Sequence, residues 1–239
     1  METKHKVYNL IILDESGSME TIKKTIMNGF NEVVQTIKSV ALEYPEQEHT
    51  VSFVSFNSSG TKKIHENSKI ELLNQIDERS YQPNGGTPLF DAMGASFFNM
   101  NWIIEKENPK NYNVLVTILT DGEENASKEH TAQSIKEIIE TYKLKNWTFT
   151  YIGANHDVDL FASRISINNV MKFETSEEDM QRMFVRDREA RMNYSKKIRN
   201  FENVSDDYFE QNEIDKKMPD DKEKQPENKS IFRRLFGGK

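Results

Sequence analysis

The sequence contains no cysteine, no long hydrophobic run and no excess of basic residues. The absence of cysteine excludes disulfide bonds, thiol catalysis and thiolate metal ligands. No apolar stretch approaches the roughly 20 residues that are needed to span a bilayer. Residues 1–5 lead into a strand-like run without the hydrophobic core of a signal peptide. We therefore expect a cytoplasmic protein without a membrane anchor.

The charge balance argues against a nucleic-acid partner. The formal net charge is −7, whereas a general nucleic-acid binder carries a basic stripe that neutralises phosphates. Basic residues do gather in one segment, but Asp187 and Glu189 interrupt them. They are Arg182, Arg186, Arg188, Arg191, Lys196, Lys197 and Arg199. This pattern favours the solvated face of a helix. An RNA-associated scaffold stays open as an alternative function.

Apolar residues predict the order of the secondary-structure elements, because they recur at steps of three and four in helices and form short runs in strands. The predicted strands are Val7–Leu13, Thr50–Phe56, Thr61–His65, Val114–Leu119, Trp147–Ile152 and Asn169–Phe173. The predicted helices cover about 24 residues from Ile22 to Pro45, a segment from Pro88 to Ile104, Ile135–Tyr142, Leu160–Arg164 and Glu177–Phe201. Thr87 is expected to cap the second of these helices, with Pro88 at its first position.

The strand composition predicts an α/β fold with a doubly wound, mostly parallel six-stranded sheet. Val7–Leu13 and Val114–Leu119 are almost continuously apolar, as is typical of central parallel strands with helices on both faces. Residues 57–60, which join the second and third strands, are too few for a parallel crossover. The third strand is therefore expected to be an antiparallel edge strand.

The domain organisation changes near residue 204. Residues 1–204 are predicted to form one domain, and residues 205–239 a disordered charged linker with few apolar groups. The linker ends in a short amphipathic motif, residues 231–236, whose apolar members are Ile231, Phe232, Leu235 and Phe236. Such a motif could dock on a partner protein, touch a membrane or fold back on its own domain. It is too short for a stable membrane anchor.

The turn after the first strand carries oxygen ligands for a metal ion. Asp14, Ser16 and Ser18 place one carboxylate and two hydroxyls at alternate positions between Val7–Leu13 and the first helix. Small oxygen ligands suit a hard divalent cation such as Mg²⁺, which requires near-octahedral oxygen coordination. Ser18 could instead cap the first helix, and Asp14 could be an ordinary acid at a strand end.

Two further residues are predicted to join this site. Asp121 closes the strand Val114–Leu119, and ligands of open α/β sheets bind at the carboxyl ends of strands where the strand order reverses. If this strand and the first one are neighbours, Asp14 and Asp121 meet in one crevice. Thr87 follows Gly85-Gly86, and these glycines allow the backbone to loop close to an ion.

Other titratable residues do not form a second metal site in the sequence. His65, His130 and His156 share no ligand spacing, so we expect no zinc site. Glu123 and Glu124 lie close to the expected crevice, as does Glu15 in the turn itself. We interpret all three acids as solvated, and the alternative is that one of them tunes the metal affinity by contacting the ligands.

Three separated motifs make the chain resemble the von Willebrand factor type A domain, of the intracellular type, over roughly residues 5–200. The motifs are Asp14-Glu15-Ser16-Gly17-Ser18, Gly86-Thr87-Pro88 and Thr120-Asp121-Gly122. The resemblance implies a metal-ion-dependent adhesion site. In such a site Ser16, Ser18 and Thr87 coordinate the ion directly, while Asp14 and Asp121 act directly or through water. The implied cofactor is Mg²⁺, with Mn²⁺ or Ca²⁺ as alternatives.

The resemblance also implies a function. A partner protein would supply a Glu or Asp side chain to the metal, in a system that contains an AAA+ ATPase, a kinase or phosphatase, or a stress or defence response. The main rival is a Mg²⁺-dependent phosphohydrolase with Asp14 as its nucleophile. That chemistry needs a second aspartate two positions later, where this chain has Ser16, and neither serine lies in a Gly-x-Ser-x-Gly elbow. We therefore expect a protein that is not an enzyme.

Overall fold

The computed structural model describes residues 4–209. The motif at residues 231–236 lies outside the described residues, as do residues 1–3 and the rest of the segment after residue 209. The elements are β1 (His5–Asp14), the 3-10 helix η1 (Gly17–Ile22), α1 (Lys23–Glu43), β2 (Gln47–Asn57), β3 (Gly60–Lys69), the 3-10 helix η2 (Ile70–Leu72), α2 (Leu89–Glu107), β4 (Tyr112–Thr120), α3 (Ala132–Lys143), β5 (Trp147–Gly153), α4 (Val158–Arg164), β6 (Asn169–Lys172) and α5 (Glu177–Arg199).

The sheet has the strand order β3-β2-β1-β4-β5-β6, which confirms the predicted doubly wound fold. All neighbouring strands are parallel except β2 and β3, which form an antiparallel hairpin with β3 at the edge. The chain builds outward from β1 to β3 and then returns to the other side of β1 to add β4. Strand order therefore reverses between β1 and β4, which is where α/β sheets bind ligands.

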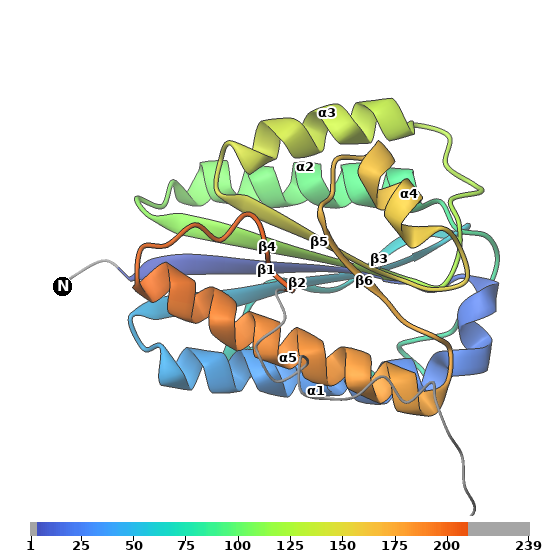
Figure 1. The fold of residues 1–239 in the computed structure, drawn as a ribbon, viewed down its shortest axis with the longest axis horizontal. Helices are drawn as coiled ribbons and strands as arrows, with labels where there is room; N and C mark the ends of the chain where they lie inside the picture. The colour runs from blue at the N-terminus through green and yellow to red at the C-terminus, as the bar shows by residue number, and fades with distance from the viewer. Residues whose placement is uncertain (1–3, 210–239) are drawn as a thin grey trace, which may run out of the picture. The chain divides into compact units, whose positions relative to one another are not determined.

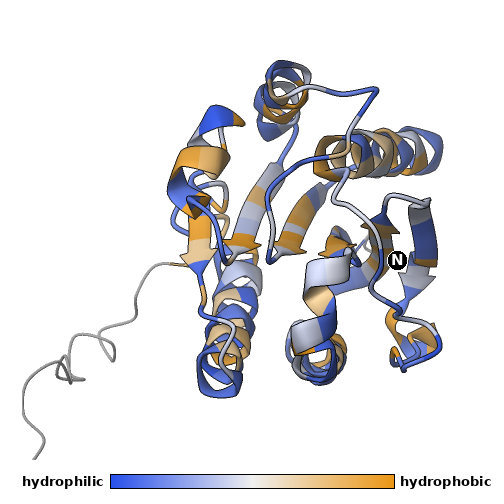
Figure 2. Ribbon diagram, turned by 90° about the vertical axis from the view of Figure 1, so that its right-hand side faces the viewer, coloured by the Kyte–Doolittle hydropathy of each residue, from blue (hydrophilic) through white to orange (hydrophobic). Residues whose placement is uncertain are grey.

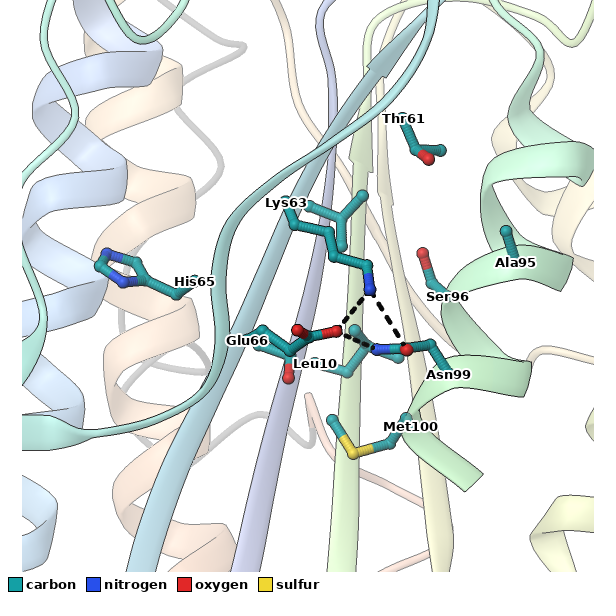
Figure 3. A pocket seen from close by; sticks show the side chains of 11 residues that line it. Leu10, Thr61, Lys63, His65, Glu66, Ala95, Ser96, Asn99 and Met100 are labelled. Atoms are coloured by element: carbon teal, nitrogen blue, oxygen red, sulfur yellow. Dashed lines mark hydrogen bonds and ion pairs between the residues drawn. The ribbon is translucent and has the colours of Figure 1, made fainter. Parts of the chain in front are cut away.

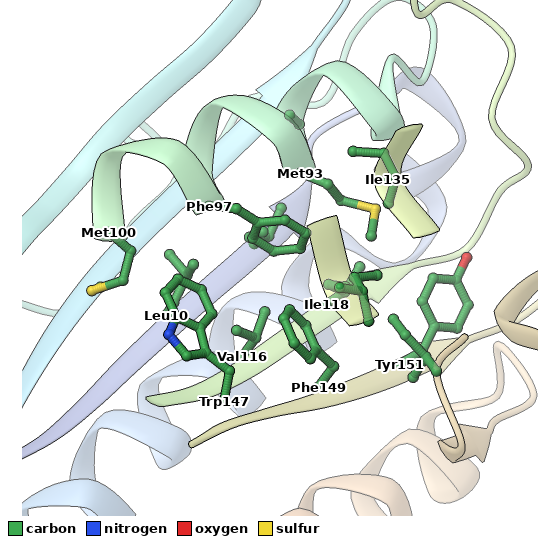
Figure 4. Packing of buried hydrophobic residues seen from close by; sticks show 14 of the residues in the cluster. Leu10, Met93, Phe97, Met100, Val116, Ile118, Ile135, Trp147, Phe149 and Tyr151 are labelled. Atoms are coloured by element: carbon green, nitrogen blue, oxygen red, sulfur yellow. The ribbon is translucent and has the colours of Figure 1, made fainter. Parts of the chain in front are cut away.

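Helices cover both faces of the sheet, and each face has its own apolar layer. Helices α2, α3 and α4 lie on one face, and α1 and α5 lie on the other (Figure 1). Hydrophobic residues lie along the strands and on the helix sides that face them (Figure 2). In the first layer, Phe97 of α2 meets Trp147 and Phe149 edge-to-face, with ring centroids 6.2 and 5.3 Å away (Figure 4).

Helix α5 corrects one interpretation of the sequence. Arg191 belongs to the basic group that was expected on a solvated face, but it is only 3% exposed. Its Nε donates to Asp187 at 2.7 Å and its Nη2 donates to Thr117 of β4 at 2.8 Å. Positions four apart share one side of a helix, so both residues fall on the stripe that α5 turns toward the sheet. Arg191 is therefore absent from any surface that an RNA could contact.

The chain after α5 continues along the sheet as far as the described residues reach. Tyr208 is buried, and its backbone N–H donates to Asn169 of β6 at 3.0 Å. The Asn169 amide donates in turn to the carbonyl of Ser205, also at 3.0 Å. The expected domain boundary at residue 204 therefore lies inside a segment that contacts β6. Between residues 4 and 209, no helix has both the length and the apolar character needed to cross a membrane.

The contact between α1 and α5 depends on a glycine and gives a test of the packing. A Cβ at Gly29 would lie 1.8–2.2 Å from ring atoms of Phe184. We expect Gly29→Ala to lower the free energy of unfolding by about 1–3 kcal/mol, because overpacking outweighs the gain in helix propensity. Urea denaturation measures the change. Adding Phe184→Leu should recover part of the loss, and a Gly29→Ala variant as stable as the wild type would contradict this packing.

Candidate metal centre

The five residues that were predicted to bind a metal lie together at one end of the sheet. Leu13 of β1 and Leu119 of β4 form the last register pair of these two strands, and Asp14 and Asp121 follow them. Thr87 reaches the same end from the loop before α2. The reversal of strand order thus brings together residues that are more than 100 positions apart in the chain.

Direct hydrogen bonds join the first turn to the end of β4. The Ser18 hydroxyl donates to Asp121 Oδ1 at 2.6 Å, and it lies 3.2 Å from the Ser16 hydroxyl oxygen. Asp14 Oδ1 accepts the backbone N–H of Ser16 at 2.7 Å, which fixes the carboxylate over its own turn. Asp14, Ser16 and Asp121 are buried, whereas Ser18 is exposed. One side of the cluster therefore remains accessible.

Thr87 is positioned by the loop that follows β4. Its backbone N–H donates to Asn125 Oδ1 at 2.9 Å, and its carbonyl accepts the Asn125 N–H at 3.1 Å. A Cβ placed on Gly122 would lie 3.6 Å from the Ser18 hydroxyl oxygen and 3.7 Å from that of Thr87. The two hydroxyls therefore border the same small space beside Gly122.

The hydroxyls are not used to cap helices, so the capping alternative is wrong. Ser16 precedes η1, but its side chain makes no capping hydrogen bond, and Ser18 lies within η1. Helix α2 begins one residue later than predicted, so its N-cap is Pro88 instead of Thr87. The physical reason is that the loop carries Thr87 toward Asn125 and the strand ends, away from the first turn of α2.

Within the part of the chain that the structure describes, neither carboxylate has a basic partner. Asp14 is 0% exposed and Asp121 is 2% exposed. Burial raises the pKa of Asp14 to about 6, with a further rise from the Asp121 charge, while hydrogen bonds from Thr120 and Ser16 oppose the shift. Burial also raises the pKa of Asp121, although the Ser18 hydrogen bond opposes it. Of the ion pairs formed within residues 4–209, none involves either residue.

These donors fit a hard divalent cation. A buried carboxylate without a counter-charge is costly, and a metal ion can supply that charge. Carboxylate and hydroxyl oxygens suit Mg²⁺, Mn²⁺ or Ca²⁺ better than softer metals. Within the described chain, no three His, Cys, Asp or Glu side chains are grouped to hold a metal. A metal ion here would therefore be held by the two carboxylates together with uncharged oxygen atoms, for which the neighbouring hydroxyls are available.

Two supporting residues were missed by the sequence interpretation. The Thr120 hydroxyl donates to Asp14 Oδ2 at 2.6 Å, and the Tyr81 hydroxyl donates to the Asp14 carbonyl at 2.7 Å. Thr120 had a signal, because it directly precedes Asp121 at a strand end. Tyr81 had none, since it lies in a loop without periodicity.

The acids near the site correct another interpretation. Glu123 is exposed, as expected, but Glu15 is only 3% exposed, so its interpretation as a solvated acid is wrong. Glu124 is half-buried, and its carboxylate accepts the backbone N–H of Phe90 at 2.9 Å and the Ser127 hydroxyl at 2.6 Å. It ties the start of α2 to the loop after β4. Hydrophobic periodicity does not predict the path of a loop, so it could not predict these hydrogen bonds between loops.

The loop before Thr87 passes close to the first turn and to the β2–β3 hairpin. Gly17 N–H donates to the Gly85 carbonyl at 3.0 Å. Gly85 has a φ of +72°, and a Cβ there would lie 2.0 Å from the Ser58 hydroxyl oxygen. Only glycine meets both conditions without strain.

A separate pocket lies between the edge strand β3 and helix α2 (Figure 3). Lys63 and Glu66 of β3 bond to each other and to Asn99 of α2 across it. The pocket is lined by none of the five residues of the candidate metal centre. The two features are therefore distinct parts of the molecule.

Comparison with known proteins gives a family match. The model of the von Willebrand factor type A domain family matches residues 10–198. No curated protein matches the chain. Among solved structures, the pilus adhesin SpaC from Lactobacillus rhamnosus GG in its open conformation has a TM-score of 0.56 at 12% identity, over 79% of this chain and 30% of that one.

Two other structures have lower scores. The SpRpn10 VWA domain has a TM-score of 0.48 at 11% identity, over 75% of this chain and 93% of that one. Proximal thread matrix protein 1 from the mussel byssus has a TM-score of 0.46 at 12% identity, over 77% of this chain and 45% of that one. The chain thus spans less than half of the mussel protein and of the pilus adhesin.

The raised pKa of Asp14 predicts how stability depends on pH without metal. Since the folded-state pKa rises from 3.8 to about 6, the folded protein binds this proton more tightly than the unfolded chain. The free energy of unfolding therefore falls as pH rises from about 4 to about 6, by up to roughly 3 kcal/mol from this group. Asp14→Asn should remove that part of the slope and be at least as stable as the wild type at pH 7.

Urea denaturation in EDTA between pH 4 and pH 7 measures both proteins. A difference between them that does not change with pH would contradict the burial of an ionisable, unpaired Asp14.

Proposed function

The chain belongs to the von Willebrand factor type A domain family, which commonly mediates protein–protein interaction, and we propose that it binds a partner protein through a divalent cation. The residues proposed to hold the cation are Asp14, Ser16, Ser18, Thr87 and Asp121. The proposed ion is Mg²⁺, with Mn²⁺ or Ca²⁺ as alternatives. The proposal makes this centre a metal-ion-dependent adhesion site.

One observation carries the proposal: Asp14 and Asp121 are buried beside hydroxyl oxygens and form no ion pair within residues 4–209. The hydroxyl ligands carry no charge, so an ion whose two carboxylates act through water would keep an attraction for another anion. Mg²⁺ usually retains water ligands, which an incoming carboxylate can replace. The accessible Ser18 side of the cluster is where a partner's Glu or Asp would approach.

The proposed partner is a protein that presents a Glu or Asp carboxylate to the bound ion. From the resemblance we propose an intracellular system that contains an AAA+ ATPase, a kinase or phosphatase, or a stress or defence response. We expect no nucleic-acid partner. The motif at residues 231–236 is a further candidate docking segment, which stays a prediction because it lies outside the described residues.

We also propose that the protein is not an enzyme. A phosphohydrolase with Asp14 as its nucleophile would need a general acid near the leaving group. The position two residues later holds Ser16, whose hydroxyl has no suitable pKa for that task and lies 3.2 Å from Ser18. The carboxylates and hydroxyls suit holding a cation, to which an anion can bind, better than they suit proton transfer.

Substitution of either carboxylate tests the metal. We expect Asp14→Ala and Asp121→Ala to abolish both Mg²⁺-dependent stabilisation and Mg²⁺-dependent partner capture, because each removes a charge that holds the ion. Wild-type protein should gain about 2.7 kcal/mol at an ion concentration 100 times its Kd. Thermal melting in Mg²⁺ and EDTA measures the gain, and a pull-down under both conditions measures capture.

Glu123→Gln is the matched control for these variants, since it removes an exposed acid two residues from Asp121. It should respond to Mg²⁺ as the wild type does. Equal melting shifts in the Asp14→Ala variant and the wild type would reject the assignment of the metal ligands.

A phosphatase assay tests the absence of catalysis. Purified protein with Mg²⁺ should hydrolyse an aryl phosphate no faster than the Asp14→Asn variant does. The reason is that Ser16, at the position of the general acid, cannot protonate the leaving group. Turnover that the wild type shows and Asp14→Asn loses would establish the rival function instead.

A further inference from the structure

The Glu15 carboxylate is buried at the centre of contacts from three other parts of the chain. Its Oε2 accepts the Ser55 hydroxyl of β2 at 2.5 Å. Its Oε1 accepts the backbone N–H of Gln82 at 2.5 Å and the Lys62 ammonium of β3 at 2.7 Å. With these bonds, an acid between two proposed metal ligands points away from them and into the β2–β3 side of the sheet.

Lys62 extends this connection to a second point of the same loop. Its ammonium donates to the Ser80 carbonyl at 2.6 Å as well as to Glu15. The Lys62 side chain is 46% exposed, whereas that of Glu15 is 4% exposed. The ion pair thus connects the surface of the edge strand to the buried turn. Lys62 binds the Ser80 carbonyl and Glu15 binds the Gln82 N–H, so the pair contacts this loop at two points.

The backbone beside Glu15 holds the rest of that loop. The Glu15 carbonyl accepts the N–H of Asn84 at 2.9 Å, and Gly17 N–H donates to the carbonyl of Gly85 at 3.0 Å. Residues 80–85 are therefore fastened to the Asp14–Ser18 turn at successive points. Thr87 follows two residues later, so these bonds help to place it together with its two hydrogen bonds to Asn125.

The strength of the Glu15–Lys62 ion pair does not by itself explain a charged group here. Desolvation of the buried Glu15 carboxylate offsets much of its attraction to Lys62, whose side chain is 46% exposed. A carboxylate, however, can accept several N–H and O–H donors at once and so define where a loop backbone lies.

We propose that Glu15 is a positioning residue that fixes Thr87 relative to the Asp14–Ser18 turn and thereby sets the affinity for the cation. Glu15 does not touch the ion. The effect on affinity rests on the proposed metal function, whereas the fastening of the loop does not. The edge strand β3 becomes part of the support of the site through Lys62.

The test combines metal affinity with loop protection. Glu15→Gln keeps the size of the side chain but removes its negative charge. That charge attracts Lys62 and strengthens the hydrogen bonds from Ser55 and Gln82. We expect the Kd for Mg²⁺, measured by isothermal titration calorimetry, to rise roughly 10- to 100-fold, as for other residues that orient metal ligands. Hydrogen exchange of residues 82–87 without metal should become faster.

Glu66→Gln is the matched control. Glu66 also pairs with a lysine of β3, Lys63, but this pair is about half exposed and faces the pocket between β3 and α2 (Figure 3). The control should leave both the Kd and the exchange of residues 82–87 unchanged. A general effect of losing an ion pair from β3 would change the control as well and would overturn the proposal.

Lys62→Met provides a second variant in case Glu15→Gln does not fold. It should also raise the Kd, and the double variant should bind no more weakly than Glu15→Gln alone, because both residues act through one connection. Unchanged Kd values and unchanged exchange in Glu15→Gln and Lys62→Met would overturn the proposal.

The hydrogen-exchange measurement tests the positioning of the loop by Glu15 separately from the proposed metal-dependent function. Wild-type protein that binds none of Mg²⁺, Mn²⁺ and Ca²⁺ would overturn the proposed function. In that case faster exchange at residues 82–87 in Glu15→Gln, but not in Glu66→Gln, would still support the fastening of the loop by Glu15.

Discussion

Asp14 and Asp121 lie buried at the ends of neighbouring parallel strands, and no lysine or arginine of the described chain neutralises them. The Thr120 hydroxyl and the Ser16 backbone N–H compensate Asp14 only in part, so its pKa stays raised. A fold that keeps two such groups together pays a free-energy cost that a cation would relieve. The hydroxyls of Ser16, Ser18 and Thr87 lie beside these two carboxylates, and the loops that carry them meet at the same end of the sheet.

The other buried acids of residues 4–209 have basic partners. Glu15 is paired with Lys62, and Asp187 is paired with Arg191 inside the layer under α5. This contrast indicates that Asp14 and Asp121 have a different role from Glu15 and Asp187. The two paired acids connect elements of the fold, whereas the two unpaired acids are free to bind a cation. The reversal of strand order then leaves the unpaired carboxylates at an accessible end of the sheet.

The strands, the antiparallel edge and the gathering of the five site residues agree with the sequence analysis. These features follow from apolar runs, the short connection at residues 57–60 and the position of acids at strand ends. The errors concern burial and caps: Glu15 and Arg191 are inside, and Pro88 occupies the cap position expected for Thr87. A charged residue is expected at the surface unless its partner is known, and those partners come from other elements.

Sequence alone determined the order of the elements and which residue types stand at the ends of β1 and β4, because hydrophobic periodicity and turn residues act within a few positions. Only the tertiary structure decided how the site is supported. Glu15 meets Lys62 across 47 positions and Ser18 meets Asp121 across 103. Such contacts depend on strand order and loop paths, since the free energy of burying a charge is set by the groups that the whole fold brings beside it.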